Sequence, residues 1–131
     1  MKNGRYIAAT ALALLAFAAL AGQALAAGYS ARALRPSYDS SALELSGSGA
    51  YRTAAVHSEL RVTVCLSKRF GTQTFTVRCS TATGSGRRVK GQVSVPGCVR
   101  GTWRTTATGE ALNRRGEWVH QASSTSRPFH C

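Results

Sequence analysis

The chain has 131 residues, of which 44% are hydrophobic and 17% are charged. Its 17 Lys and Arg residues outnumber five Asp and Glu residues, which gives a formal net charge of +12 at pH 7. Only the N-terminus carries a long apolar run, so the sequence excludes a transmembrane segment in the remainder of the chain.

Residues 1–26 have the three-part layout of a secretory signal peptide. A positively charged start is followed by an uncharged apolar run from Ile7 to Leu20 and by the small-residue site Ala24-Leu25-Ala26. The run is shorter than the roughly 20 residues of a membrane-spanning helix, which disfavours the alternative of an uncleaved anchor. We therefore expect a secreted, extracellular protein whose mature chain starts at Ala27 and carries a net charge of +10.

Residues 27–42 show little periodicity and are interpreted as an extended N-terminal arm, with disorder as the alternative. From Leu43 the pattern changes to a period of two. Leu43 and Leu45 alternate with polar neighbours, and the segment 47–49, Gly-Ser-Gly, is expected to end this short strand. Residues 51–57 form a second candidate strand.

The clearest strand runs from residue 60 to residue 66. One face carries Leu60, Val62, Val64 and Leu66, and the other carries Arg61, Thr63 and Cys65. A turn at residues 67–71 leads to a Thr-rich strand at residues 72–80. Two strands joined by a short loop that contains glycine predict a β-hairpin.

Further alternating segments follow at regular spacing. They cover residues 89–95, 101–108 and 117–123, with turns at 83–86 and 96–97 and a polar loop at 109–116. No long helical period appears after the signal peptide. The pattern predicts an all-β fold, an immunoglobulin-like antiparallel β-sandwich of about seven strands with two disulfides, formed by residues 43–131.

The four cysteines are interpreted as two disulfides, because their number is even and the chain is exported. They are Cys65, Cys79, Cys98 and Cys131. Three pairings are open. We favour Cys65–Cys79, which would close the hairpin, and Cys98–Cys131, which would hold the C-terminus. Cys65 lies on the polar face of its strand and Cys79 on the apolar face of the next, so this pairing needs a covered face or a β-bulge.

No catalytic residue is expected. Glu110 and Glu117 flank one loop and resemble a carboxylate pair, but Arg114 and Arg115 lie in the same loop, so a salt-bridged turn is the favoured interpretation. The sequence contains no recognisable nucleophile motif. It therefore predicts a protein that is not an enzyme.

No metal site or cofactor is expected either. His57, His120 and His130 are not spaced as metal ligands, and the cysteines form no Cys-x-x-Cys motif. Trp103 and Trp118 each lie on the alternating face of a predicted strand. They are interpreted as core residues rather than as a platform for a flat ligand.

The candidate binding residues are two arginine pairs, Arg87-Arg88 and Arg114-Arg115, which are both assigned to turns. Two turns at one end of a sandwich can form a single basic patch that binds a polymer of phosphate or carboxylate groups. The alternatives are two solvated loops and the arginine bias of a GC-rich genome. Export makes nucleic acid an unexpected native partner.

Loose motifs of cysteine, glycine and tryptophan extend over residues 60–131. They are Val64-Cys65-Leu66, Val77-Arg78-Cys79, Cys98-x-x-Gly101-x-Trp103-Arg104, Ala107-x-Gly109 and Gly116-x-Trp118, followed by Ser126 and Cys131. This pattern resembles small secreted, disulfide-bonded β-sandwich proteins of GC-rich filamentous soil bacteria. The resemblance implies a fold and a secreted location but no catalytic residues. Apoproteins of the neocarzinostatin type are similar in architecture only.

These features predict a secreted, non-enzymatic binding or interaction module with a cationic surface. Its expected partner is another secreted protein or an anionic extracellular polymer. One alternative is an adaptor or structural subunit of a secreted assembly, such as an antagonistic toxin complex, with residues 27–42 docking into the partner. The other alternative is a small enzyme inhibitor.

Overall fold

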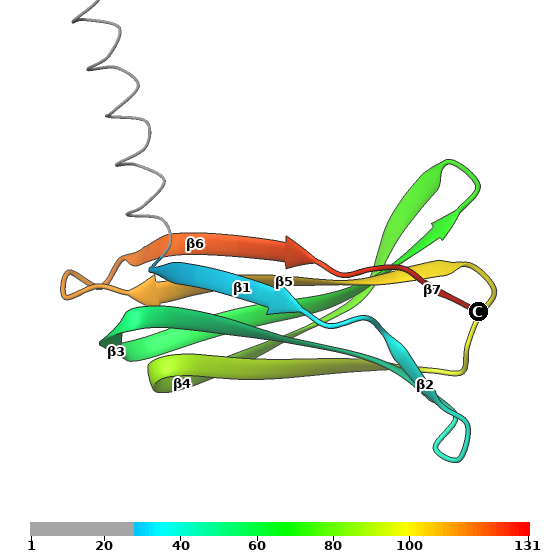
Figure 1. The fold of residues 1–131 in the computed structure, drawn as a ribbon, viewed down its shortest axis with the longest axis horizontal. Coiled ribbons are helices and arrows are strands. Elements are labelled where there is room, and N and C mark those ends of the chain that lie inside the picture. The colour runs from blue at the N-terminus through cyan, green and yellow to red at the C-terminus, as the bar shows by residue number, and fades with distance from the viewer. Residues whose placement is uncertain (1–27) are drawn as a thin grey trace, which may run out of the picture.

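The computed structural model describes residues 28–131, so the predicted signal peptide lies outside the described residues. The strands are β1 (Tyr29–Ala33), β2 (Ser37–Asp39), β3 (Glu44–Phe70), β4 (Gln73–Pro96), β5 (Thr102–Leu112), β6 (Trp118–Thr125) and β7 (Phe129–His130). Figure 1 shows them stacked in two layers. Within this part of the chain there is no helix with the length and hydrophobicity that a bilayer crossing requires.

One long hairpin provides the frame of the fold. β3 and β4 have 27 and 24 residues and pair in antiparallel fashion from Glu44↔Pro96 to Phe70↔Gln73. The ladder is interrupted between Arg52 and Leu60, opposite Gly86, which has a φ of 103°. Bulges of this kind bend strands. The hairpin therefore folds over on itself, and each half belongs to a different layer.

The other strands pair with the two halves of β3. β1 and β2 pair with its first half, which also pairs with the second half of β4. β5 pairs with its second half, and β6 and β7 pair with β5. The result is the predicted all-β fold, an immunoglobulin-like antiparallel sandwich of seven strands with two disulfides.

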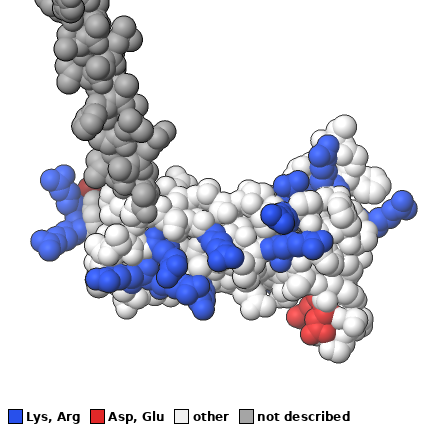
Figure 2. Space-filling view, in the orientation of Figure 1, with Lys and Arg blue, Asp and Glu red and all other residues white. Residues whose placement is uncertain are grey.

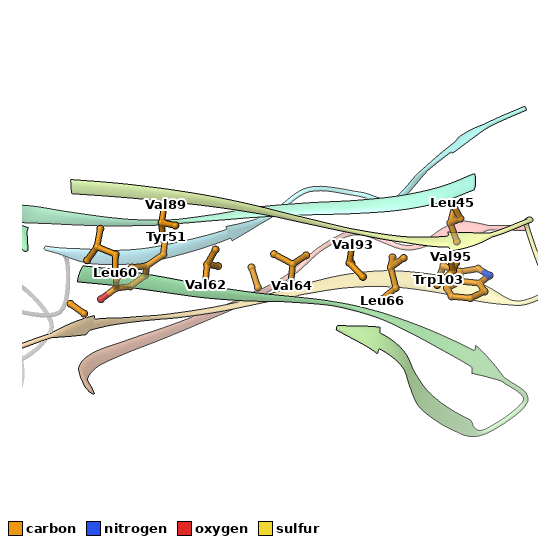
Figure 3. Packing of buried hydrophobic residues seen from close by; sticks show 12 residues of the cluster. Leu45, Tyr51, Leu60, Val62, Val64, Leu66, Val89, Val93, Val95 and Trp103 are labelled. Carbon is orange, nitrogen blue, oxygen red and sulfur yellow. The ribbon is translucent and has the colours of Figure 1, made fainter. Parts of the chain in front are cut away.

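The core follows from the alternation in β3. The side chains of Leu60, Val62, Val64 and Leu66 are fully buried, whereas the residues between them face outward. Figure 3 shows these side chains between the layers, with Tyr51 and Leu60 toward one end and Trp103 at the other. Burying apolar surface in this way is the main favourable contribution to folding.

The glycines at residues 47 and 49 do not end a strand, which corrects the sequence-based prediction. Both lie inside β3 and face the opposite layer. A Cβ atom on Gly47 would lie 2.6 Å from the Thr105 hydroxyl, and one on Gly49 would lie 2.6 Å from the Cβ of Ala107. Glycine is required here because the two layers approach closely. The predicted turn at residues 83–86 is likewise a bend within β4.

Residues 28–42, the described part of the predicted extended arm, are built into the sheet instead. Tyr29–Ala33 pairs with β3 from Thr53 to Gly49, and Ser37–Asp39 pairs with it further along. β1 also lies near β6 of the other layer, since the Ala33 amide donates a hydrogen bond to the Ser124 hydroxyl at 3.4 Å. The segment therefore closes one side of the sandwich.

Both predicted disulfides are confirmed. Cys65 and Cys79 are directly opposite each other in the ladder, with Cα atoms 4.1 Å apart, and Cys98 bonds to Cys131. The register shifts immediately beyond the first bridge, where Leu66 is opposite Arg78 and Ser67 is opposite Thr76. Val77 is the extra residue of this β-bulge, which resolves the conflict of faces that the alternation suggested.

Candidate functional site

Four basic side chains lie on the outer face formed by β1 and the paired halves of β3 and β4. Arg32 is opposite Ala50, Ala50 is opposite Lys90, and Arg52 is opposite Arg88. Residues 50 and 52 point to the same side because strand side chains alternate, and Tyr51 between them is fully buried. Arg32, Arg52, Arg88 and Lys90 are all exposed, and we call them the cationic face.

A groove of about 630 Å³ lies on this face. Its floor includes Ser48 and Ala50, two small residues of the central strand. Longer side chains line the walls: Arg32 from β1, Leu34 directly after β1, and Arg88, Lys90 and Gln92 from β4. Figure 2 shows one group of Lys and Arg toward the end where β3 and β4 are labelled in Figure 1, and a second group toward the opposite end.

No carboxylate lines this groove. Within residues 28–131 the structure has one ion pair, between Arg61 and Glu110 at 3.3 Å on β3 and β5. Asp39 and Glu44 are opposite each other at the β2 end of the sheet, away from the groove. The cations of the face are therefore not neutralised by acidic neighbours and create a positive potential.

The structure separates the two predicted arginine pairs. Arg87 and Arg88 lie within strand β4 rather than in a turn, and Arg88 lines the groove. Arg114 and Arg115 are exposed in the β5–β6 turn, where Arg114 lines a second, smaller hollow with Val56 and His57. Both pairs lie toward the same end of the sandwich (Figure 1), but they border different hollows.

Sequence reasoning missed Arg32, Arg52 and Lys90 as members of the site. Arg32 was assigned to the arm, and the register that aligns Arg52 with Arg88 depends on pairing across 36 residues. One local signal was present. Arg88, Lys90 and Gln92 alternate with the apolar or small residues of a strand, which indicates an outward polar face.

The β5–β6 turn differs from the predicted salt-bridged loop. The Asn113 side-chain oxygen accepts hydrogen bonds from the backbone amides of Arg115 and Glu117, both at 2.9 Å, and this fixes the turn. Glu110 pairs with Arg61 instead of with the loop arginines.

The two tryptophans have different environments. Trp103 is a core residue, as predicted, with 2% exposure and an indole N–H that donates to the Val99 carbonyl at 2.8 Å. Trp118 is only half-buried, which corrects the prediction of a core position. The Arg61 guanidinium lies 3.9 Å from its ring centroid, in a cation–π arrangement.

Two of the three histidines come together at one end of the sandwich. The ring of His120 stacks on Tyr29 with centroids 3.8 Å apart, and His57 lies 6.5 Å from His120. Within residues 28–131 no group of three His, Cys, Asp or Glu side chains is placed to hold a metal ion. The third histidine, His130, lies in β7 at the other end, 3.2 Å from the Thr102 hydroxyl.

Comparisons with known proteins assign no family. No protein-family model matches the chain, and no curated protein sequence matches it. Solved structures with some similarity include β-glucuronidase 2 of Bacteroides uniformis, with 12% identity and a TM-score of 0.45 over 79% of this chain and 13% of that chain. This chain therefore spans only a small part of that enzyme.

Two smaller solved structures are matched over most of their length. CsgH of R. palustris has 11% identity and a TM-score of 0.36, over 71% of this chain and 89% of that chain. A PapD-like domain of human CEP192 has 9% identity and a TM-score of 0.40, over 79% and 87%. At such identities and TM-scores, these similarities assign no function to this protein.

Proposed function

We propose that this protein is an exported, non-catalytic binding module whose cationic face binds an anionic extracellular polymer. The observation that carries the proposal is a groove that is lined by Arg32, Arg88 and Lys90 and by no carboxylate. Arg52 lies on the same face, opposite Arg88. The two disulfides support an extracellular location, because such bonds persist in oxidising compartments.

The dimensions of the face favour a polymer over a single small anion. β1 and β4 flank β3, so their basic side chains start about 10 Å apart, and the two rows of the ladder are separated by about 7 Å along the strands. A chain of repeated phosphate or carboxylate groups lying in the groove meets several cations at once. Arginine also offers paired N–H donors to each such group.

The alternative of an adaptor arm has less support from the fold. Residues 29–33 and 37–39 already occupy positions in the sheet. Removing them would expose the edge of β3 and part of the core rather than release a docking segment. The cationic face, in contrast, is accessible on the folded domain.

Two matched charge-reversal variants test the proposal. R88E/K90E alters the groove, and R114E/R115E alters the turn, and each lowers the net charge by the same amount. Binding of fluorescent polyphosphate to the mature protein should weaken by at least about tenfold in the first variant, from the loss of charge-assisted hydrogen bonds. The second variant should change it little.

Salt provides the second readout. Affinity of the unmodified protein should fall steeply as ionic strength rises, because salt screens exposed charges. Equal losses in both variants would show that net charge alone drives binding. Unchanged binding by R88E/K90E would overturn the assignment of the face.

A further inference from the structure

The tip of the β3–β4 hairpin forms a second exposed surface, separate from the cationic face. Beyond the Cys65–Cys79 bridge the hairpin continues for residues 66–78. Residues 66–69 still pair with β5, and Figure 1 shows the end of the hairpin projecting from the body of the sandwich. Every residue from 71 to 80 is exposed. This tip presents apolar side chains to the surroundings: Phe70 is 62% exposed, Phe75 50% and Val77 46%.

The apolar character of the tip is a continuation of the core face. Phe70 follows Leu66 and Lys68 at a spacing of two, so it points to the side of β3 that is buried elsewhere. Lys68 is directly opposite Phe75, which places both phenylalanines on that same side. The apolar side of β3 thus continues beyond the end of the opposite layer, which covers this side in the body of the sandwich.

Basic residues surround these apolar side chains. Lys68, Arg69 and Arg78 lie in the hairpin itself, and Arg104 on β5 is exposed opposite Ser67. No Asp or Glu occurs anywhere between residues 60 and 109. The hairpin itself therefore combines apolar side chains with basic ones and carries no acidic residue.

We propose that the hairpin tip inserts into the interface of an anionic lipid bilayer. Phe70 and Phe75 enter the boundary between headgroups and acyl chains, and Lys68, Arg69 and Arg78 bind lipid phosphates. Apolar burial and attraction to anionic lipids act together in interfacial binding. Charge favours a bilayer over a second copy of the chain, because two tips in contact would place like charges together.

Vesicle binding separates this inference from binding by the cationic face. The mature protein is centrifuged with vesicles of phosphatidylcholine alone or mixed with phosphatidylglycerol. F70S/F75S should lower the affinity for the mixed vesicles by at least about tenfold, because it removes most of the inserted apolar surface. The control L43S/V56S replaces two other exposed apolar residues, with exposures of 62% and 68%, and should bind as the unmodified protein does.

Insertion itself is read from a tryptophan placed at the tip. The fluorescence of Phe70→Trp should shift to the blue with the mixed vesicles, whereas that of Val56→Trp should not. Binding without such a shift, or full binding by F70S/F75S, would overturn the inference. A dimer in sedimentation equilibrium that F70S/F75S dissociates would overturn it in favour of self-association.

Discussion

At the scale of single residues, Tyr51 shows how a polar group stabilises this core. Its ring is fully buried, and its hydroxyl donates a hydrogen bond of 2.6 Å to the His120 carbonyl, which joins β3 to β6 across the sandwich. Burial raises the pKa of Tyr51 to about 12, and Tyr29 and Glu110 act in the same direction. The folded protein therefore favours the neutral phenol of Tyr51 over the ionised phenolate.

Tyr51→Phe should lower the free energy of unfolding by about 1 kcal/mol, since it leaves the His120 carbonyl without this donor. In the unmodified protein the pKa is raised on folding. The contribution of Tyr51 to the free energy of unfolding is therefore complete below pH 10 and is lost as the pH rises toward 12. In this pH range the unfolded chain releases the Tyr51 proton, whereas the folded protein retains it. Urea unfolding and tyrosinate absorbance measure the two effects. If the Tyr51→Phe variant still formed tyrosinate with a step near pH 12, the assignment of that raised pKa to Tyr51 would be contradicted.

The alternation of apolar and polar residues correctly predicted which side chains are buried in a strand that is paired on both sides. Leu60, Val62 and Val64 are buried as expected. It failed at Leu43, which is 62% exposed because a φ of 55° places it in a turn. The alternation also failed at Trp118, whose ring packs against the guanidinium of Arg61 on the outer face. The sequence of one segment does not show which residue adopts a positive φ or which side chain of a neighbouring strand it will contact.

At the scale of elements, glycine was the main source of error. A glycine in a strand pattern marks either a turn or a close approach of two chains. The segment 47–49 was expected to end a strand, but Gly47 and Gly49 allow the folded hairpin to pack against β5. The existence of the hairpin and its disulfide was predictable from local pattern. Its fold into two layers depends on contacts between residues far apart in sequence.

Gly49→Ala should destabilise the protein by about 1–3 kcal/mol, because the added methyl would meet the Cβ of Ala107 and the backbone oxygen of Arg32. Gly84→Ala is the matched control. A Cβ atom there would make only ordinary contacts, at 3.6 Å to Val89, and its backbone lies outside the left-handed region. Denaturant unfolding compares the two. Equal stability of both variants would refute the close packing of the layers.

At the scale of the whole molecule, charge is distributed unevenly over a scaffold held by two disulfides. The strongly positive net charge of the chain was evident from the sequence, and so was a pair of basic residues at 87 and 88. The grouping of Arg32, Arg52 and Lys90 with Arg88 was not, because it requires the register of three strands. The acidic residues Asp39 and Glu44 are opposite each other at β2, which lies toward the other end of the same sheet (Figure 1).

Residue-level mapping tests the central claim most directly. Amide chemical shifts of the isotope-labelled mature protein are followed during titration with polyphosphate at low ionic strength. We expect the largest changes on β1 and on the paired halves of β3 and β4, around residues 32, 52, 88 and 90, with reversal on addition of salt. Changes centred on the turn at residues 113–116, or spread evenly over all basic residues, would contradict a binding site on the cationic face.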